Sequence, residues 1–190
     1  MTERWRCFVA VPLDASVRTA LEGARQPWLT RPDLEGLRWT DPSAWHLTLA
    51  FLGDVEEAAV PEIVATVREV ARRHGPMRLP AGGVGAFPVP ARARVAWYGI
   101  DDPESRLGDL ARDLGAALHV EVGDPFRPHV TLARARRAPV DLRHWISDAA
   151  RAAPSAMISV DVMELLRSHV GRGAAAYETL ASMPLTGAPR

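Results

Sequence analysis

Two short stretches of the sequence carry the residues best suited to chemistry, and they share one pattern. Residues 46–49 and residues 129–132 each read His, an apolar residue, Thr, Leu. Histidine changes charge near neutral pH, so His46 or His129 could donate a proton while the other accepts one. Such a pair could open a phosphodiester by activating water on one side and protonating the departing oxygen on the other. Thr48 and Thr131 could donate hydrogen bonds to the phosphate oxygens, and this chemistry needs no metal.

Both motifs lie in apolar runs with strand character, which predicts where their side chains point. Side chains alternate between the two faces of a strand, so His46 and Thr48 share one face while Leu47 and Leu49 share the other. The second copy follows the same alternation. A simpler interpretation, that each motif is a strand with a polar, solvated face, accounts for one copy but not for the repetition.

Three residues near the motifs could help to bind a substrate. Arg134 follows the second motif and Arg127 precedes it. Either guanidinium could hold a phosphate, and Arg134, at the strand end, is the better candidate. Phe51, near the end of the first motif strand, could stack on a base or could pack in the core, and the sequence leaves both interpretations open.

Other chemistries fit the sequence poorly. No two histidines have the spacing of a common zinc motif, and the glycine-rich residues 82–85 lack the Lys-Ser/Thr of a phosphate-binding loop. The lone cysteine, Cys7, lies in an apolar run without a neighbouring base. We therefore expect no metal and no cofactor. The four remaining histidines are expected at the surface or at helix ends, and they are His74, His119, His144 and His169.

The composition is that of an ordinary globular chain. The 190 residues are 47% hydrophobic and 24% charged, and the net charge is zero, so bulk charge neither favours nor excludes nucleic acid. No apolar run approaches the length of a membrane span, and a single cysteine cannot form an internal disulfide. We expect a monomer in the cytoplasm, with no membrane contact and with residues 1–190 forming one domain.

The order of elements suggests a repeated arrangement. Strands are expected at residues 4–11, 45–52, 94–100, 119–122, 129–134, 159–167 and 174–183, and helices at residues 15–25, 56–74, 103–118 and 140–151. Asp14 is expected to cap the first helix, residues 82–85 to form a tight bend or bulge, and residues 171–173 to turn a closing hairpin. Each motif strand precedes a helix, and the motifs lie about half the chain apart. This favours a pseudo-twofold α+β fold whose motif strands meet across a central cleft.

The chain resembles the 2H phosphoesterase superfamily, which is named for two His-x-Thr/Ser motifs, and within it the RNA 2′,3′-cyclic phosphodiesterases, also called 2′–5′ RNA ligase-like proteins. The resemblance spans nearly the whole chain. Its segments are residues 6–13, 38–53, 83–88, 94–97, 126–134, 165–168 and 177–180.

The resemblance implies a fold, a reaction and roles for the site residues. The fold would be bilobal, with two antiparallel-rich sheets lining the cleft and helices outside. The reaction would be the metal-independent opening of a 2′,3′-cyclic phosphate at an RNA or nucleotide end to leave a 2′-phosphate. His46 would protonate the departing 3′ oxygen and His129 would activate water. The phosphate would contact Thr48, Thr131 and Arg134, and Phe51 would line the base site.

Several alternatives remain open at this point. The enzyme could instead act on 2′–5′ linkages, as a phosphodiesterase or a ligase, or on a small cyclic nucleotide. The chain could also be a non-catalytic module that binds RNA ends. Retention of both histidines and both threonines disfavours a binding module, because binding alone does not need an acid and a base.

Overall fold

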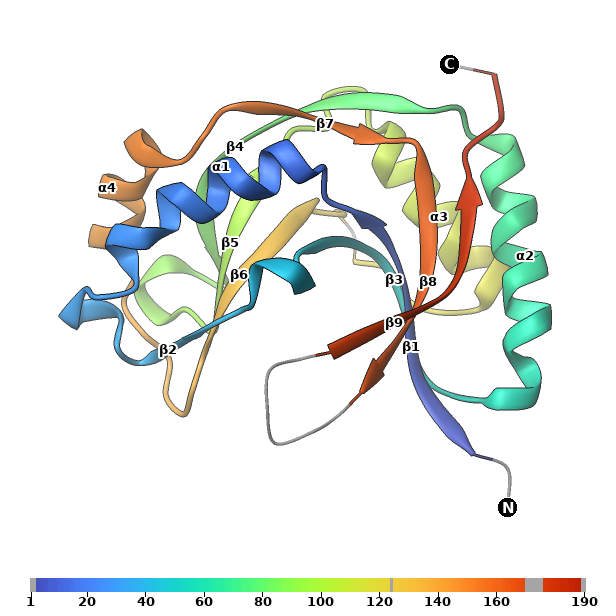
Figure 1. Ribbon diagram of the computed structural model, residues 1–190, viewed down its shortest axis with the longest axis horizontal. Coiled ribbons are helices and arrows are strands. Elements are labelled where there is room, and N and C mark those ends of the chain that lie inside the picture. The colour runs from blue at the N-terminus through green and yellow to red at the C-terminus, as the bar shows by residue number, and fades with distance from the viewer. Residues whose placement is uncertain (1–2, 124, 170–175, 189–190) are drawn as a thin grey trace.

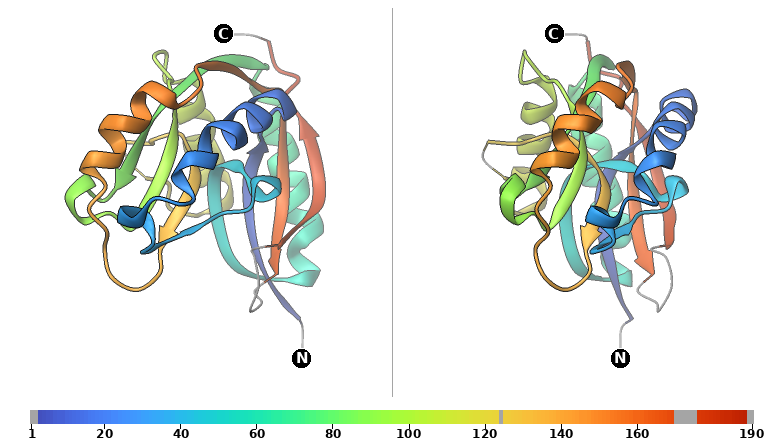
Figure 2. Two further views of the ribbon diagram at one scale, coloured as in Figure 1. Left: turned by 60° about the vertical axis from the view of Figure 1, so that its left-hand side comes forward. Right: turned by 90° about the vertical axis from the view of Figure 1, so that its left-hand side faces the viewer.

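The fold is built around one strongly curled antiparallel sheet (Figures 1 and 2). The computed structural model describes residues 3–123, 125–169 and 176–188, and within them nine strands form the sheet. The strands are β1 (Arg4–Pro12), β2 (Leu37–Trp39), β3 (His46–Glu56), β4 (Met77–Phe87), β5 (Val95–Ile100), β6 (His129–Ala135), β7 (Ala156–Val160), β8 (Val162–His169) and β9 (Ala176–Pro184). The α-helices of the same residues are α1 (Ala15–Arg25), α2 (Val60–Arg73), α3 (Arg106–Leu118) and α4 (Arg143–Ala152).

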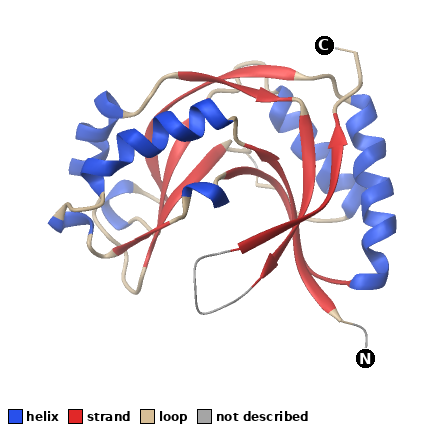
Figure 3. Cartoon of the chain, in the orientation of Figure 1, coloured by secondary structure: helices blue, strands red, loops and turns tan. Residues whose placement is uncertain are grey.

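The sheet has two similar halves that meet at the motif strands. The strand order is β7-β4-β5-β6-β3-β1-β8-β9, so three strands lie outward of β6 and three outward of β3. Helices α2 and α3 pack on the β3 half, while α4 contacts β4 and α1 contacts β7 in the other half. Figure 3 shows these two helix pairs on opposite sides of the molecule, with the strands between them. The expected pseudo-twofold α+β fold is confirmed, and the two expected sheets are the halves of one continuous sheet.

The strands of the β3 half come from both ends of the chain, and the main strands of the β6 half come from its middle. Strand β8 comes late in the sequence but pairs with β1. Strand β4 follows a helix of the β3 half but pairs with β5 in the β6 half. Likewise α1 follows β1 but contacts β7, and α3 follows β5 but contacts β3. The two halves are therefore interleaved along the sequence.

Several expected elements differ from the structure. The first motif strand does not stop at Gly53, because β1 keeps pairing with β3 as far as Arg4↔Glu56 and Gly53, with φ +70°, lies beside a register shift. The expected strand at residues 159–167 is two strands, which break at Asp161 because β7 pairs with β4 and β8 with β1. The short strand β2 was not predicted at all. The helix expected from residue 56 begins at Val60, with Pro61 in its first turn.

Local contacts explain two further differences. Residues 119–122 form no strand, because His119 ends α3 in the left-handed conformation and the Val120 amide donates to the Gly115 carbonyl. Asp14 stands at the start of α1 but does not cap it with its side chain. Its carboxylate accepts the Ser159 amide at 2.8 Å instead and so ties α1 to β7.

The glycine-rich stretch confirms the expected bulge. The pairing of β4 with β5 shifts register between Gly82 and Val84, where Gly83 has φ +68°. At Gly85 an added Cβ would lie 2.2 Å from the Trp97 ring, so only glycine lets the strands pack this closely. The closing strands β8 and β9 pair as a hairpin, although the predicted turn at residues 171–173 lies outside the described residues.

The contact between the two halves yields the first prediction. Leu47 is 2% exposed and forms the described strand pair between β3 and β6 with Val130. Replacing Leu47 with Ala should lower the free energy of unfolding by about 2–5 kcal/mol, because it leaves a cavity where the halves join. Urea unfolding measures the change. The matched control is Leu29→Ala, at a side chain 40% exposed, which should cost under about 0.5 kcal/mol. If the two substitutions lowered the free energy of unfolding equally, the Leu47–Val130 contact would not be what joins the two halves.

Candidate active site

The antiparallel pairing of β3 with β6 organises the site. Leu47 lies opposite Val130, and both side chains point into the core. If this register continues by one residue in each direction, His46 lies across from Thr131. In the same way His129 lies across from Thr48. The two histidines therefore stand diagonally opposite each other on the face away from the core, each beside a threonine of its own strand and another of its neighbour.

This face forms the floor of a cleft of about 750 Å³. The structure brings together all the residues that the sequence singled out for the site. The lining includes His46, Thr48, Phe51, Arg127, His129, Thr131 and Arg134. The cleft is large enough to receive a nucleotide and some of its neighbours.

A β-bulge decides where Phe51 points. Phe51 is five residues after His46, and in a regular strand this odd spacing would put it on the core face. The register between β3 and β1 shifts between Thr48 and Ala50, so Leu49 is the extra residue of a bulge. The bulge turns Phe51 back toward the cleft, where 60% of the residue is exposed. The interpretation of Phe51 as a core residue is therefore wrong.

Arg134 reaches the cleft in the same way. It is five residues after His129, and the register between β6 and β5 shifts between Thr131 and Ala133. Leu132 is the extra residue here, and its bulge brings Arg134 onto the face of the histidine. A β-bulge thus directs a side chain into the cleft in each half. This side chain is an aromatic ring in one half and a cation in the other.

Both histidines are held by matching hydrogen bonds. Nδ1 of His46 lies 2.7 Å from the Ala44 carbonyl oxygen, and Nδ1 of His129 lies 2.7 Å from the Arg127 carbonyl oxygen. A carbonyl oxygen can only accept, so each Nδ1 must carry the proton. In the neutral imidazole this leaves Nε2 free to accept a proton, and in the cation Nε2 can donate one.

Burial lowers the pKa of both histidines. The pKa of His46 falls to about 4, mainly through burial and further through the charges of Arg134 and His129, against the opposing effect of the Ala44 carbonyl. The pKa of His129 is also lowered by burial and by Arg134, while the Arg127 carbonyl raises it. Both imidazoles are therefore neutral at pH 7 without substrate, and an anionic phosphate between them would favour their protonation.

Aromatic side chains that sequence reasoning missed surround the two imidazoles. The ring of His46 lies 4.9 Å from that of Phe8 and 5.1 Å from that of Tyr177, while Phe87 lies 4.9 Å from His129. Phe8 belongs to a small apolar cluster separate from the main core. These residues come from β1, β4 and β9, so no local motif links them to the histidines, and only the sheet topology shows the contact.

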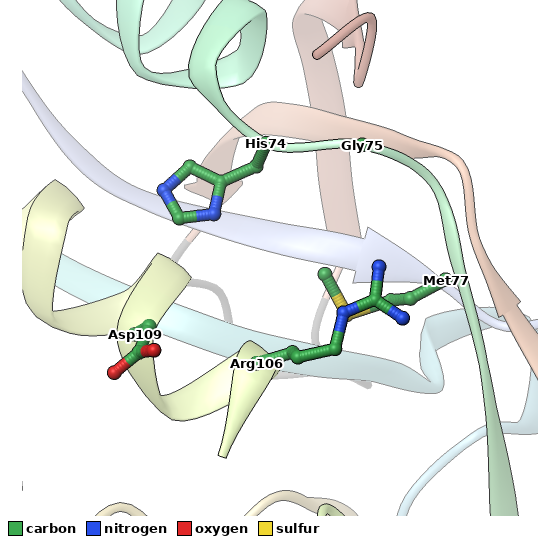
Figure 4. Close-up of a pocket in the computed structure, with 5 residues that line it drawn as sticks. All are labelled: His74, Gly75, Met77, Arg106 and Asp109. Atoms are coloured by element: carbon green, nitrogen blue, oxygen red, sulfur yellow. The ribbon is translucent and has the colours of Figure 1, made fainter. Parts of the chain in front are cut away.

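The other histidines do not take part in the cleft. His74 ends α2 as expected, but it is buried, and its Nε2 pairs with Asp113 at 2.9 Å. It borders a second hollow of about 20 Å³ with Met77, Arg106 and Asp109, which has room for about one water molecule (Figure 4). Among the residues that the structure describes, no three His, Cys, Asp or Glu side chains gather closely enough to hold a metal ion.

Comparison with known proteins places the fold in a class. The structure of Escherichia coli LigT in complex with 3′-AMP superposes with a TM-score of 0.73 at 28% identity, over 97% of this chain and 99% of that one. The family model "LigT like Phosphoesterase" matches residues 11–97. The architecture is therefore that of a phosphoesterase.

Curated relatives narrow the class to a family. An RNA 2′,3′-cyclic phosphodiesterase of Thermus thermophilus is 37% identical over 144 residues, which cover 70% of each chain. A protein of the same name from Geobacillus stearothermophilus is 31% identical over 194 residues, 98% of this chain but 59% of that relative. The chain thus spans less than two thirds of the length of some relatives. It belongs to the LigT-like phosphoesterase family.

The lowered pKa of His46 predicts a pH-dependent stability. Unfolded chains take up a proton at His46 near pH 6.5, whereas the folded chain does so only near pH 4. The free energy of unfolding should therefore fall as the pH drops through this window. Urea unfolding between pH 7 and pH 4 measures the slope, which should be shallower in His46→Gln. Leu29→Ala, which removes no titratable group and lies at an exposed side chain, is the control and should keep the wild-type slope. A wild-type slope in His46→Gln would contradict the assignment.

Proposed function

We propose that this chain opens 2′,3′-cyclic phosphates at RNA or nucleotide ends to 2′-phosphates without a metal. The observation that carries the proposal is the pair of imidazoles, each anchored at Nδ1, that share one cleft with two threonines and an arginine. The relatives named RNA 2′,3′-cyclic phosphodiesterase support this choice of substrate. No described helix is both long enough and apolar enough to cross a membrane.

The proposed reaction divides proton transfer between the two histidines. Nε2 of His129 removes a proton from water, and the water oxygen forms a new bond to phosphorus. The bond between phosphorus and the 3′ oxygen breaks, and protonated His46 gives its proton to that oxygen. The products are a 2′-phosphate and a 3′-hydroxyl. Solvent then returns the two histidines to their starting protonation states.

The remaining site residues would bind the charged phosphate and the base. Thr48 and Thr131 would donate to the non-bridging oxygens, whose charge must be stabilised in the transition state. Arg134 in β6 would add a positive charge after His129, and Arg127 would add one from the loop that precedes this strand. Exposed Phe51 would offer its ring to the base, since an aromatic face accepts any base.

The same proposal covers the working unit. A single copy would suffice as a monomer, because β3 and β6 of one chain supply both histidines, both threonines and Arg134. Residues 1–190 would act as one bilobal domain, which the interleaving of the halves supports. The cytoplasm is the proposed compartment, in line with the single buried Cys7.

Loss of either histidine should nearly abolish turnover. His46→Ala and His129→Ala should each slow the opening of a 2′,3′-cyclic nucleotide by about 10² to 10⁴, the usual contribution of a general acid or base. The assay contains excess chelator and separates 2′- from 3′-phosphate by chromatography. His144→Ala, outside the cleft, should keep the wild-type rate.

Each outcome of this assay has a clear meaning. A 2′-phosphate product supports the proposed orientation, whereas a 3′-phosphate would reverse the substrate in the cleft. Near-normal turnover in either cleft variant would contradict the mechanism. Binding of a 2′,3′-cyclic nucleotide without turnover by the wild-type chain would favour the binding module, and turnover of 2′–5′ linkages alone would favour that alternative.

A further inference from the structure

Thr40 lies where β6 changes its partner on one edge. β6 pairs with β3 at Val130 and with β2 over residues 133–135. Between these stretches lie Thr131 and Leu132, whose carbonyl groups need donors on this edge. Thr40 directly follows β2 and stands at this gap.

Three hydrogen bonds join Thr40 to the gap. Its hydroxyl oxygen lies 2.9 Å from the Thr131 carbonyl oxygen and 2.8 Å from that of Leu132, and its amide donates to the Leu132 carbonyl at 2.9 Å. A hydroxyl has one hydrogen, so the two carbonyl groups share it in a three-centre bond. Leu132 is the bulge residue that turns Arg134 into the cleft, so Thr40 binds the bulge itself.

Two side chains hold Thr40 from behind. Nε1 of Trp45 donates to the Thr40 hydroxyl oxygen at 2.8 Å, which leaves that hydroxyl's hydrogen for the bulge carbonyl groups. Arg25, only 7% exposed, donates to the Thr40 carbonyl at 2.7 Å, and its guanidinium lies 5.3 Å from the Trp45 ring centroid. A buried cation in such contacts is strongly constrained in position.

The other half of the fold lacks this hydroxyl. An Asp-Pro pair stands five and four residues before each motif histidine, at residues 41–42 and 124–125. The residue before the pair is Thr40 in the first case and Gly123 in the second. Glycine has no side chain, so Gly123 cannot donate a hydroxyl to a bulge as Thr40 does.

We propose that Thr40, held by Arg25 and Trp45, is a positioning residue that fixes the Leu132 bulge and so holds Arg134 in place for an anionic phosphate. The inference rests on the proposed function for the ligand of Arg134. Without the Thr40 hydroxyl, the Thr131 carbonyl group loses this donor and the Leu132 carbonyl group keeps only the Thr40 amide, so the bulge no longer fixes the direction of Arg134.

A double-mutant cycle read out by phosphate binding tests the clamp. Inorganic phosphate is titrated by calorimetry into the wild type, Thr40→Val, Arg134→Gln and the double variant. Each single change should weaken binding by about 10-fold, the scale of one hydrogen bond to a charged group. The double variant should bind about as weakly as Arg134→Gln alone, because both changes remove one interaction. Thr40→Ser, which keeps the hydroxyl, should bind within about twofold of wild type.

Several results would overturn the proposal. They are additive losses in the double variant, wild-type affinity in Thr40→Val, weak binding in Thr40→Ser, or no phosphate binding by the wild type. If Thr40→Val does not fold, Trp45→Phe removes the donor behind Thr40 while it keeps a smaller aromatic ring beside Arg25 in the core. It should weaken binding by about threefold, but not in the Arg134→Gln background. Phosphate binding needs no turnover, so a non-additive cycle in a chain without activity would contradict the proposed function and leave the clamp standing.

Discussion

The contact between Leu47 and Val130 is the constraint on which the rest of the structure depends. It joins the two halves of the sheet through β3 and β6, and it buries both side chains in the core. Because side chains alternate along a strand, burying this pair directs the neighbouring histidines and threonines to the opposite face. One apolar contact thus sets the register, the depth and the mutual orientation of the polar residues. A one-residue slip of either strand would turn its histidine into the core.

The two halves of the fold are similar, but a few residues that differ between them make the site chemically asymmetric. Both motif strands carry a bulge after the motif threonine, and the residue turned into the cleft is Phe51 in one half and Arg134 in the other. The same half that carries Arg134 has Thr40 in place of Gly123. A nucleotide is itself asymmetric, with a flat base and a charged phosphate, so these differences give the cleft a direction that the paired histidines alone do not have.

Much of the fold and the site could be predicted because the signals are local. Alternation around His46 and His129 predicted the strands and their polar face, and the repeated motif predicted that the strands meet. Phe51 and Arg134 were named as candidates, but their direction depends on bulges, which depend on the register with β1 and β5. Phe8 and Tyr177 were missed because they lie far from His46 in the sequence, and only the arrangement of β1, β3 and β9 in the sheet brings them to it. The repeated Asp-Pro pair marks the position of Thr40 in the sequence. Its role could not be predicted, because it depends on carbonyl groups of a strand far away in the sequence.

The two histidines have different roles in the proposed reaction, with His46 as the acid and His129 as the base, and a change of leaving group separates these roles. A phosphodiester that releases p-nitrophenolate needs no proton donor for the departing oxygen, but it still needs an activated water. Rates of His46→Ala and His129→Ala would be compared on this substrate and on a 2′,3′-cyclic nucleotide. We expect the activated substrate to restore His46→Ala to near the wild-type rate and to leave His129→Ala slow. Rescue of both variants, of neither, or of His129→Ala alone would contradict these roles.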